Sequence, residues 1–447
     1  MRLNLFFRVA RQCRLLEESC GWTRDQLEYE QFRRLAALRR FAVEHSPFYR
    51  RFHRGLEDRP LQDLPILTKS ILMDNFDELV TDREVRLSEV REFLAGSPGY
   101  ALFRERYVVL LTSGSTGMQG VFLFNPQEWL AALANIARPV VWSRPKQGLR
   151  MPQRSAIVAS RTPWHHSDRV AASFCTRWML RLDAAEPIDL LVQRLNAWQP
   201  RSVASYPSIL RQLAQEQLAG RLRVRLLSAA TCAEVLTNET RKRVHDAWGI
   251  RIYDTYGATE YAPIAAECSH GNMHLVEDGA IIEVIDARGR TVPPGVQGDR
   301  ILLTVFSRWT QPLIRYEITD SLILMPEQCE CGRNFRVVST ITGRHRDILT
   351  FPHKDGRRTT VTAHANLLYP VLETVPATAW QVVHDEHGLW ISFVGLRDTC
   401  ALSGISESIS SVLEHQGALV PPIHVREVAE LERGATGKAP LILSRLR

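Results

Sequence analysis

Six small residues in a row, Thr112-Ser113-Gly114-Ser115-Thr116-Gly117, form the segment of this chain best suited to bind phosphate. They follow an apolar stretch, residues 107–111, that predicts a buried strand. The two glycines allow the backbone to curl, so that successive N–H groups can point into one concavity, and the hydroxyl groups add donors. The loop is not a Walker A motif, because the lysine of that motif is missing. The alternative interpretation is an ordinary solvated turn.

Four later segments carry further residues that could do chemistry, and they are Tyr253–Glu260, Leu313–Asp320, Thr342–Asp347 and Arg433–Pro440. With the loop at 112–117, and in this order, they resemble the adenylate-forming superfamily of acyl-CoA synthetases and adenylation domains. The resemblance is to the phenylacetate-CoA ligase branch in particular, including its relatives that adenylylate a deazaflavin coenzyme. It covers the chain from about residue 30 to the end.

The resemblance implies an enzyme, an AMP-forming ligase, with a two-step reaction. A small-molecule carboxylic acid attacks the α-phosphate of ATP, which releases pyrophosphate and leaves an acyl-adenylate. The thiol of CoA, or another acceptor, then attacks this mixed anhydride. The first step brings two anions together, so it needs positive charge and Mg²⁺ near the phosphates.

The resemblance also implies roles for single residues in binding ATP. Thr112, Ser113, Gly114, Ser115, Thr116 and Gly117 would hold the β- and γ-phosphates. Tyr256 would lie against the adenine, in the same nucleotide-binding block as Gly257 and Thr259. Glu260 would help to hold Mg²⁺, since hard cations take carboxylate oxygens. The alternative for Tyr256 and Glu260 is a solvated tyrosine and a surface glutamate.

Three further residues complete the implied site. Asp320 would accept hydrogen bonds from both ribose hydroxyls, and Arg344 would contact the ribose or a phosphate. Arg315 is a weaker candidate. Lys438 lies between two glycines in a loop that could swing into the site, where its ammonium would neutralise charge on the carboxylate and the α-phosphate.

Some positions depart from the family pattern. No lysine follows Gly117, and Ala230 stands where many relatives have a glutamate beside the adenine, although Glu234 is near. The run Thr350–Gly356 replaces a familiar motif after the hinge at Asp347. The acceptor therefore stays open: CoA leads, and the alternative is an amine, a hydroxyl or a carrier-protein thiol.

A second set of residues points to a metal. Cys329 and Cys331 lie in a turn-like segment, and Cys268 and His274 lie about sixty residues upstream. Three thiols and an imidazole suit tetrahedral zinc, and relatives in the resembled branch have matching residues that look able to bind a structural zinc. His270 competes with His274 as the fourth ligand, and the alternative is three free cysteines.

The acid itself is expected to be aromatic or medium-sized and apolar. This expectation depends on candidate pocket residues in segments 160–170 and 203–209, and these residues are Trp164, His165, His166, Tyr206 and Pro207. Core packing would explain the same residues equally well.

Composition sets broad limits. At 447 residues, the chain is longer than one hydrophobic core usually serves. No apolar run reaches membrane-spanning length, and we expect a cytoplasmic location, which agrees with ATP chemistry. The net charge of +7 is modest and its arginines are scattered, so nucleic-acid binding is not expected. A homodimer is an open expectation.

Apolar runs alternate with helix-like stretches between residues 108 and 253, which predicts an α/β fold with mainly parallel sheets and crossover helices. The predicted strands are 108–111, 156–159, 203–206, 224–228 and 250–253. From residue 274 onward, short β-rich pieces predict an antiparallel subdomain. By the resemblance, residues 1–343 form an N-terminal adenylation domain, and residues 344–447 form a small mobile α+β lid.

Overall fold

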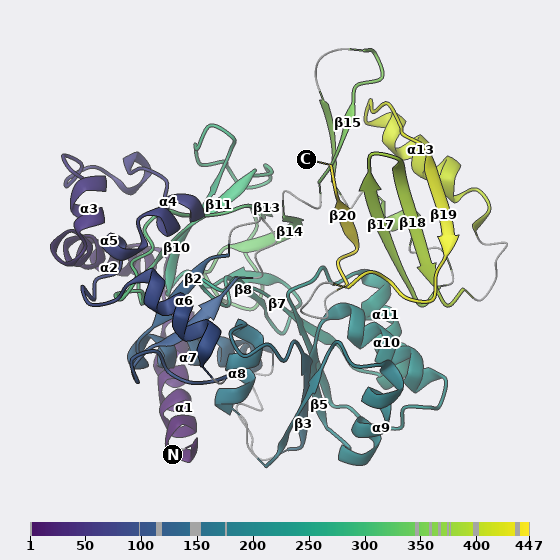
Figure 1. Ribbon diagram of the computed structural model, residues 1–447, viewed down its shortest axis with the longest axis horizontal. Helices are drawn as coiled ribbons and strands as arrows, with labels where there is room; N and C mark the ends of the chain where they lie inside the picture. The colour runs from purple at the N-terminus through teal and green to yellow at the C-terminus, as the bar shows by residue number, and fades with distance from the viewer. Residues whose placement is uncertain are drawn as a thin grey trace. The chain divides into compact units, whose positions relative to one another are not determined.

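The structure is a computed structural model that describes residues 2–97, 99–112, 119–143, 153–174, 177–344, 348–356, 360–364, 368–372, 375, 377–396, 402–433 and 439–446 (Figure 1). Several predicted site residues lie outside the described residues: Ser113, Gly114, Ser115, Thr116, Gly117 and Lys438. The expected hinge residue Asp347 also lies outside them. Arg344 is described only by its backbone.

Contacts within the chain define two compact units. The first comprises Met1–Gln153, Arg161–Arg181 and Tyr253–Thr340, and the second comprises Arg154–Ser160, Leu182–Ile252 and Ile341–Arg447. The predicted division at residue 343 concerns a mobile lid. These contacts do not test that motion, so the division stays a prediction.

The first unit is mainly helical in its N-terminal third and β-rich in its last third. Its helices are α1 (Arg2–Glu18), η1 (Ser19–Gly21), α2 (Arg24–His45), α3 (Pro47–Phe52), η2 (Leu61–Asp63), α4 (Lys69–Asp74), α5 (Phe76–Leu79), α6 (Leu87–Gly96), α7 (Pro126–Ser143) and α8 (His166–Phe174). The start of α2 is specified locally, because the side chains of Thr23 and Gln26 each accept a backbone N–H of the other residue in a capping box.

The strands of the first unit form three sheets. They are β1 (Val108–Leu111), β2 (Val121–Phe124), β7 (Ile252–Tyr256), β8 (Ala265–Glu267), β9 (Met273–Leu275), β10 (Ala280–Ile285), β11 (Arg300–Val305), β12 (Tyr316–Ile318), β13 (Asp320–Leu324) and β14 (Val337–Arg344). The pair β1-β2 is an antiparallel hairpin, and β10-β11-β12 is an antiparallel sheet. The third sheet has the order β13-β14-β9-β8-β7.

These strands confirm the predicted antiparallel subdomain and correct one expectation. The run 108–111 is a strand, but it pairs antiparallel with β2 and does not join a parallel sheet. The reason is the short connection of residues 112–120, because a parallel partner needs a crossover of a dozen or more residues.

The second unit contains the predicted parallel strands with their crossover helices. Here β3 (Ser155–Ala159), β5 (Ser202–Ser205) and β6 (Ser228–Cys232) pair in parallel, and β4 (Met179–Asp183) crosses the boundary between the units. Helices α9 (Ile188–Trp198), α10 (Pro207–Leu218) and α11 (Asn238–Trp248) accompany them. The predicted strand 224–228 is wrong except for its last residue. Val224 and Leu226 are buried, so an irregular segment mimics a strand pattern.

The C-terminal part of the second unit is an α+β layer, as expected. Its strands are β15 (Ile348–Pro352), β16 (Thr360–His364), β17 (Ala379–Asp385), β18 (Gly388–Val394), β19 (Ile423–Glu427) and β20 (Ile442–Ser444), and its helices are α12 (Tyr369–Leu372) and α13 (Ile405–His415). The sheet order is β19-β18-β17-β20, and α13 lies over one face of this sheet (Figure 1). Trp380, Phe351 and Phe393 anchor the core between them.

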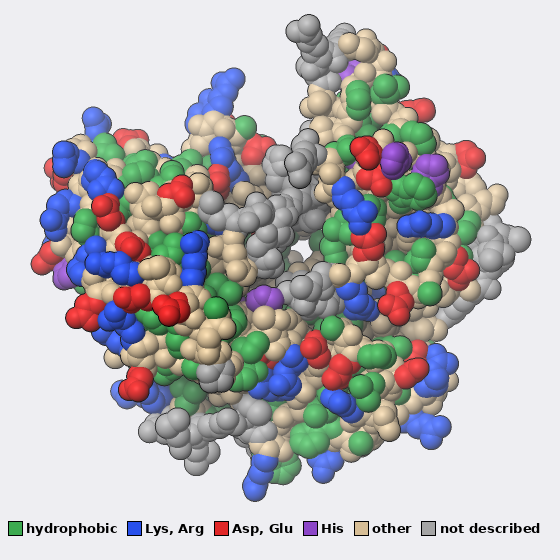
Figure 2. All heavy atoms as spheres, in the orientation of Figure 1, with side chains coloured by type: hydrophobic (Ala, Val, Ile, Leu, Met, Phe, Trp, Pro, Cys, Tyr) green, Lys and Arg blue, Asp and Glu red, His purple; other side chains and the backbone are tan. Residues whose placement is uncertain are grey.

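The surface shows mixed charge. In Figure 2, basic and acidic side chains of the described residues are interspersed over the visible face and do not form a stripe of one sign. Among the described residues, none of the helices combines the length and apolar character that a membrane span requires.

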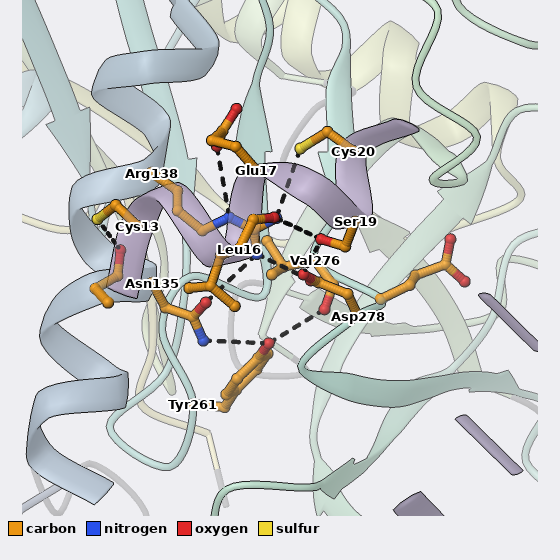
Figure 3. A network of polar contacts seen from close by, with 12 residues as sticks. Cys13, Leu16, Glu17, Ser19, Cys20, Asn135, Arg138, Tyr261, Val276 and Asp278 are labelled. Carbon is orange, nitrogen blue, oxygen red and sulfur yellow. Dashed lines mark hydrogen bonds and ion pairs between the residues drawn. The ribbon is translucent and has the colours of Figure 1, made fainter. Parts of the chain in front are cut away.

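A buried polar network fixes the N-terminal helix to the rest of the first unit (Figure 3). Arg138 of α7 donates to Asp278 Oδ1 at 2.9 Å and to the backbone oxygen of Leu16 at 3.1 Å. Ser19 Oγ donates to Asp278 Oδ2 at 2.5 Å. Both members of the ion pair are almost fully buried, with side-chain exposures of 1%. The sequence did not predict this helix, which lies upstream of the family resemblance.

Candidate active site

Two of the predicted nucleotide-binding residues meet directly. The hydroxyl of Tyr256, at the end of β7, donates to Asp320 Oδ2 at 2.5 Å, although the residues are 64 positions apart. Asp320 begins β13 and is 9% exposed. A carboxylate held in this way keeps further lone pairs for other donors. The fold therefore brings the expected adenine and ribose positions to one place.

Close packing explains the glycine next to Tyr256. A Cβ placed on Gly257 would lie 3.0 Å from Ala262 Cβ and 3.3 Å from Ala262 Cα. Real Cβ atoms rarely approach so closely, so a larger residue would push the backbone of this turn away from its neighbour. Gly257 therefore allows the Tyr256–Glu260 block to fold back tightly.

The predicted phosphate loop is closed at its base by a strand-like pair. Thr112 N donates to Gly120 O at 3.0 Å, and Gly120 N donates to Thr112 Oγ1 at 2.8 Å. This pair extends the β1-β2 hairpin to the residues that flank 113–118. Thr112 thus has a structural partner, and its role in phosphate binding stays a prediction.

The predicted magnesium ligand Glu260 is buried and lines a small polar cavity. Its Oε1 accepts the hydroxyl of Tyr316 at 2.9 Å. Burial and this carboxylate both raise the pKa of Tyr316, so the phenol stays protonated and donates. The cavity is lined by Phe124, Glu128, Ala132, Asn135, His166, Thr259, Glu260, Tyr261, Ala262, Ser307 and Arg308.

Hard oxygen donors are present in this cavity, as Mg²⁺ requires. The carboxylate of Glu260 uses one lone pair for Tyr316 and retains others. The hydroxyl of Thr259 lies on the same wall. The chemistry of these residues fits the predicted metal.

Sequence reasoning missed Arg308 in this cavity. The residue is 1% exposed, and its guanidinium lies 3.8 Å from the centroid of the Phe124 ring. Burial lowers the pKa of Arg308 to about 10, whereas Glu128 and Glu260 act in the opposite direction. It remains a cation near neutral pH. The only sequence signal was its place just upstream of the Leu313–Asp320 motif.

Arg315, the weaker candidate, has a structural role. Its Nε donates to Glu283 Oε2 at 3.1 Å, and its Nη1 donates to the backbone oxygens of Gln62 and Leu64. It thus ties the segment before α4 to the antiparallel sheet. Its ion pair with Glu283 is buried on both sides, so Arg315 is committed to the fold.

The residues expected near the acid divide between the two units. His166 lines the cavity of the first unit, where burial lowers its pKa to about 4 and keeps it neutral near pH 7. The backbone oxygen of Trp164 accepts Leu111 N at 2.8 Å, beside the phosphate loop. Tyr206 and Pro207 belong to the second unit, at the start of α10. The expectation of an aromatic or medium-sized apolar acid stays a prediction.

The second unit also accounts for Glu234. Its Oε2 accepts Ser208 N at 3.0 Å and so caps α10, and its Oε1 accepts Ala439 N at 3.1 Å. This carboxylate therefore contacts the residue that follows Lys438 in the sequence. The roles of Lys438 and Arg344 stay predictions, because the structure does not describe those side chains.

The four predicted metal ligands come together in the first unit. One ligand atom from each of Cys268, His274, Cys329 and Cys331 lies within 4.8 Å of all the others. Cys268 Sγ is 3.8 Å from Cys329 Sγ, and Cys331 Sγ is 3.2 Å from His274 Nε2. A tetrahedral site with zinc–sulfur bonds of about 2.3 Å has sulfur–sulfur edges of about 3.8 Å. The arrangement fits zinc.

A hydrogen bond prepares His274 for this role. Its Nδ1 lies 3.0 Å from the backbone oxygen of Phe335, which can only accept, so Nδ1 carries the proton. Nε2 then presents its lone pair towards the thiols. Metal-bound histidines usually have such a partner on the other nitrogen. The competing candidate His270 is not among the residues brought together.

Comparison with known proteins agrees with this architecture. Residues 103–303 match the family model of the AMP-binding enzymes. The chain is 25% identical over 345 residues to a phenylacetate-coenzyme A ligase of Thermus thermophilus, which covers 73% of this chain and 72% of the relative. It is 22% identical over 302 residues to protein CapK of Staphylococcus aureus, covering 65% and 60%.

A solved structure shares the fold. A 2-hydroxyisobutyryl-CoA ligase in the postadenylation state has a TM-score of 0.71 at 19% identity, and the match covers 95% of this chain and 91% of that one. The chain is an AMP-binding enzyme of the adenylate-forming superfamily. Within that superfamily it is similar to the phenylacetate-coenzyme A ligase branch.

Proposed function

We propose that this enzyme activates a carboxylic acid with ATP and transfers the acyl group to CoA. In the first step, a carboxylate oxygen bonds to the α-phosphorus and the bond to pyrophosphate breaks. In the second step, the CoA sulfur bonds to the acyl carbon, and AMP leaves as the thiol proton is lost to solvent. The relatives named as coenzyme A ligases support CoA as the acceptor.

One observation carries the proposal. The motif residues Tyr256, Glu260 and Asp320 are linked by hydrogen bonds of Tyr256 to Asp320 and of Tyr316 to Glu260, within the unit that contains most of the matched AMP-binding region. In this assignment, Tyr256 and Asp320 hold the adenosine. Glu260 would hold Mg²⁺, which neutralises phosphate charge when it is bound. We place the reaction in the cytoplasm, where ATP and CoA are available.

Zinc has a separate role in this proposal. Cys268, His274, Cys329 and Cys331 would bind one structural zinc ion, because four protein ligands leave no position for a substrate. The support is the convergence of three thiols and an oriented imidazole. The ion would stabilise the first unit and take no part in acyl transfer.

The test is acid-dependent exchange of pyrophosphate into ATP, measured over a panel of aryl, aliphatic and dicarboxylic acids. We expect at least one acid to drive exchange and to yield a CoA thioester when CoA is added. If the adenylate forms but only an amine, a hydroxyl or a carrier-protein thiol consumes it, the alternative acceptor is correct. An absence of exchange with every acid would contradict the proposal.

A further inference from the structure

The cavity beside Glu260 contains a cation that its own protein neighbours do not satisfy. Nε and Nη1 of Arg308 are buried and have no hydrogen-bond partner within the described part of the chain. Its Nη2 makes one long contact, 3.3 Å, to Gln311 Oε1. Leaving charged donors unpaired in a buried place is costly. The site therefore favours a ligand that supplies acceptors.

The neighbouring carboxylates do not play this part. Glu128 Oε1 accepts the backbone N–H groups of Trp309 and Thr310, both at 2.6 Å, and its Oε2 accepts Asn125 N at 2.8 Å. Glu260 is bonded to Tyr316. Neither carboxylate forms an ion pair with Arg308 among the described residues, although both lie close enough to affect its pKa.

Packing holds the guanidinium at the cavity. Arg308 is stacked on Phe124, and Gln311 is itself anchored to β2 by a bond from Leu123 N and a bond to Val121 O. The side chain is 1% exposed, so it has no path to solvent without disturbing this hairpin. Arg308 is the only lysine or arginine among the described residues that line the cavity, and His166 is neutral there.

The cavity is also small. It encloses about 290 Å³ of space in all, open solvent included, of which about 10 Å³ can hold the centre of a water molecule. A void of that size takes about one water or one small polar group. An aromatic ring would have to displace the wall, and an apolar chain would leave the donors of Arg308 unpaired.

We infer that this cavity binds an anionic substituent of the acid, so that the substrate is a short dicarboxylic acid whose second carboxylate pairs with Arg308. This inference rests on the proposed function and narrows its substrate class. A site built to bond a polar substrate group strongly rejects the analogue that lacks the group. Arg308 is then a specificity-determining binding residue.

The experiment compares acids of matched length with wild-type protein and two variants. Malonate, succinate and glutarate are set against propionate, butyrate, valerate, benzoate and phenylacetate in the exchange assay. We expect a short dicarboxylic acid to have the highest kcat/KM, and Arg308→Met to lower that value about a hundredfold. The variant should retain or improve its activity with the matched monocarboxylic acid. Arg426→Met, which removes an arginine stacked on Trp390 in the second unit, is the control.

Calorimetric binding of the dicarboxylate without ATP gives a second readout, which Arg308→Met should abolish. If Arg308→Met does not fold, Arg308→Lys keeps the charge, and it should raise KM for the dicarboxylate while preserving kcat. Preference for an aryl or monocarboxylic acid, with no effect of Arg308→Met, would overturn the inference but not the proposed function. So would an equal rise in KM for ATP with every acid, since the bound anion would then be a phosphate. If no acid drives exchange, the proposed function fails, and absence of binding in calorimetry would overturn the inference separately.

Discussion

The hydroxyl of Tyr256 and the carboxylate of Asp320 lie in two motifs that are far apart in the chain, and they share one hydrogen bond. Glu260 and Tyr316 form a second pair between the same two motifs. Each carboxylate is therefore held by a phenol before any ligand binds. Such preorganisation reduces the ordering that nucleotide binding would otherwise require.

Asp320→Asn tests the ribose assignment. An amide offers a weaker acceptor than a carboxylate, so we expect KM for ATP to rise about 10-fold or more, in line with roughly 1.5–3 kcal/mol for hydrogen bonds to charged groups. The measurement is exchange rate against ATP concentration. Tyr256→Phe is the matched control, because it removes the donor but keeps the ring, and its effect should be smaller. An unchanged KM for ATP in Asp320→Asn would argue against ribose binding.

His53 makes the stability of the protein depend on pH. It is 2% exposed, and neither ring nitrogen has a partner among the described residues. Burial, with a smaller contribution from Arg39, lowers the pKa of His53 to about 4, against about 6.5 when unfolded. The unfolded state therefore binds more protons between these values. The contribution of the neutral imidazole is complete above pH 6.5 and is lost as the pH falls to 4, by about 3 kcal/mol.

We expect His53→Phe to flatten the fall in unfolding free energy between pH 6.5 and pH 4, measured by urea denaturation at several pH values. His424→Phe, at an exposed histidine stacked on Trp390, should leave the slope as in the wild type. A slope that does not change in His53→Phe would show that this residue is not the one protonated on acid unfolding.

At the scale of elements, the Arg138–Asp278 pair joins the N-terminal helix to α7 and to the segment before β10 (Figure 3). Ser19 and the backbone of Leu16 complete the junction from the side of α1. Such a pair specifies where α1 lies, but it does so in a buried place where an unpaired charge is costly. The junction should be sensitive to the loss of one partner alone.

Asp278→Asn should lower the free energy of unfolding by about 3–5 kcal/mol, because Arg138 would stay buried without its counter-charge. Replacing both residues, Arg138→Met with Asp278→Leu, should cost much less. Urea titration of the two variants checks this. Equal losses in the single and double variants would mean that packing, and not the uncompensated charge, determines the effect.

The cysteine cluster belongs to the same scale, since it joins the β8-β9 turn to the segment before β14. We expect one zinc ion per chain in protein purified without chelator, measured by elemental analysis. Cys331→Ser should lose the metal and lower the thermal midpoint more than it changes the exchange rate. Cys232→Ser, a free cysteine outside the cluster, is the control. Zinc-free wild-type protein would refute the assignment.

At the scale of the whole molecule, the family resemblance implies that a lid delivers Lys438 for adenylation and then rotates for acyl transfer. Lys438→Ala should slow adenylate formation about a hundredfold, a loss of about 3 kcal/mol. Transfer from a supplied acyl-adenylate should change much less, because the carboxylate charge is already gone. The two half-reactions are measured separately. Equal loss in both would mean that Lys438 is structural or that the lid does not alternate.

The sequence by itself determined the class of the protein and much of its local structure. The ordered motifs indicated an adenylate-forming enzyme, and periodicity placed β1, α9 and α10 within a residue or two. The metal ligands Cys268, His274, Cys329 and Cys331 were also named before their convergence was visible. These features were predictable because residue type and spacing along the chain encode them directly.

Only the tertiary structure decided which residues share an environment. It turned Arg315 from a candidate ligand into a clamp on the segment before α4, and it showed Arg308, in no recognised motif, to be a buried cation beside Glu260. It also added the first helix and its junction at Arg138. Burial and pairing depend on contacts between segments hundreds of residues apart. No local pattern records those contacts, so the sequence could not distinguish a structural arginine from one that awaits a ligand.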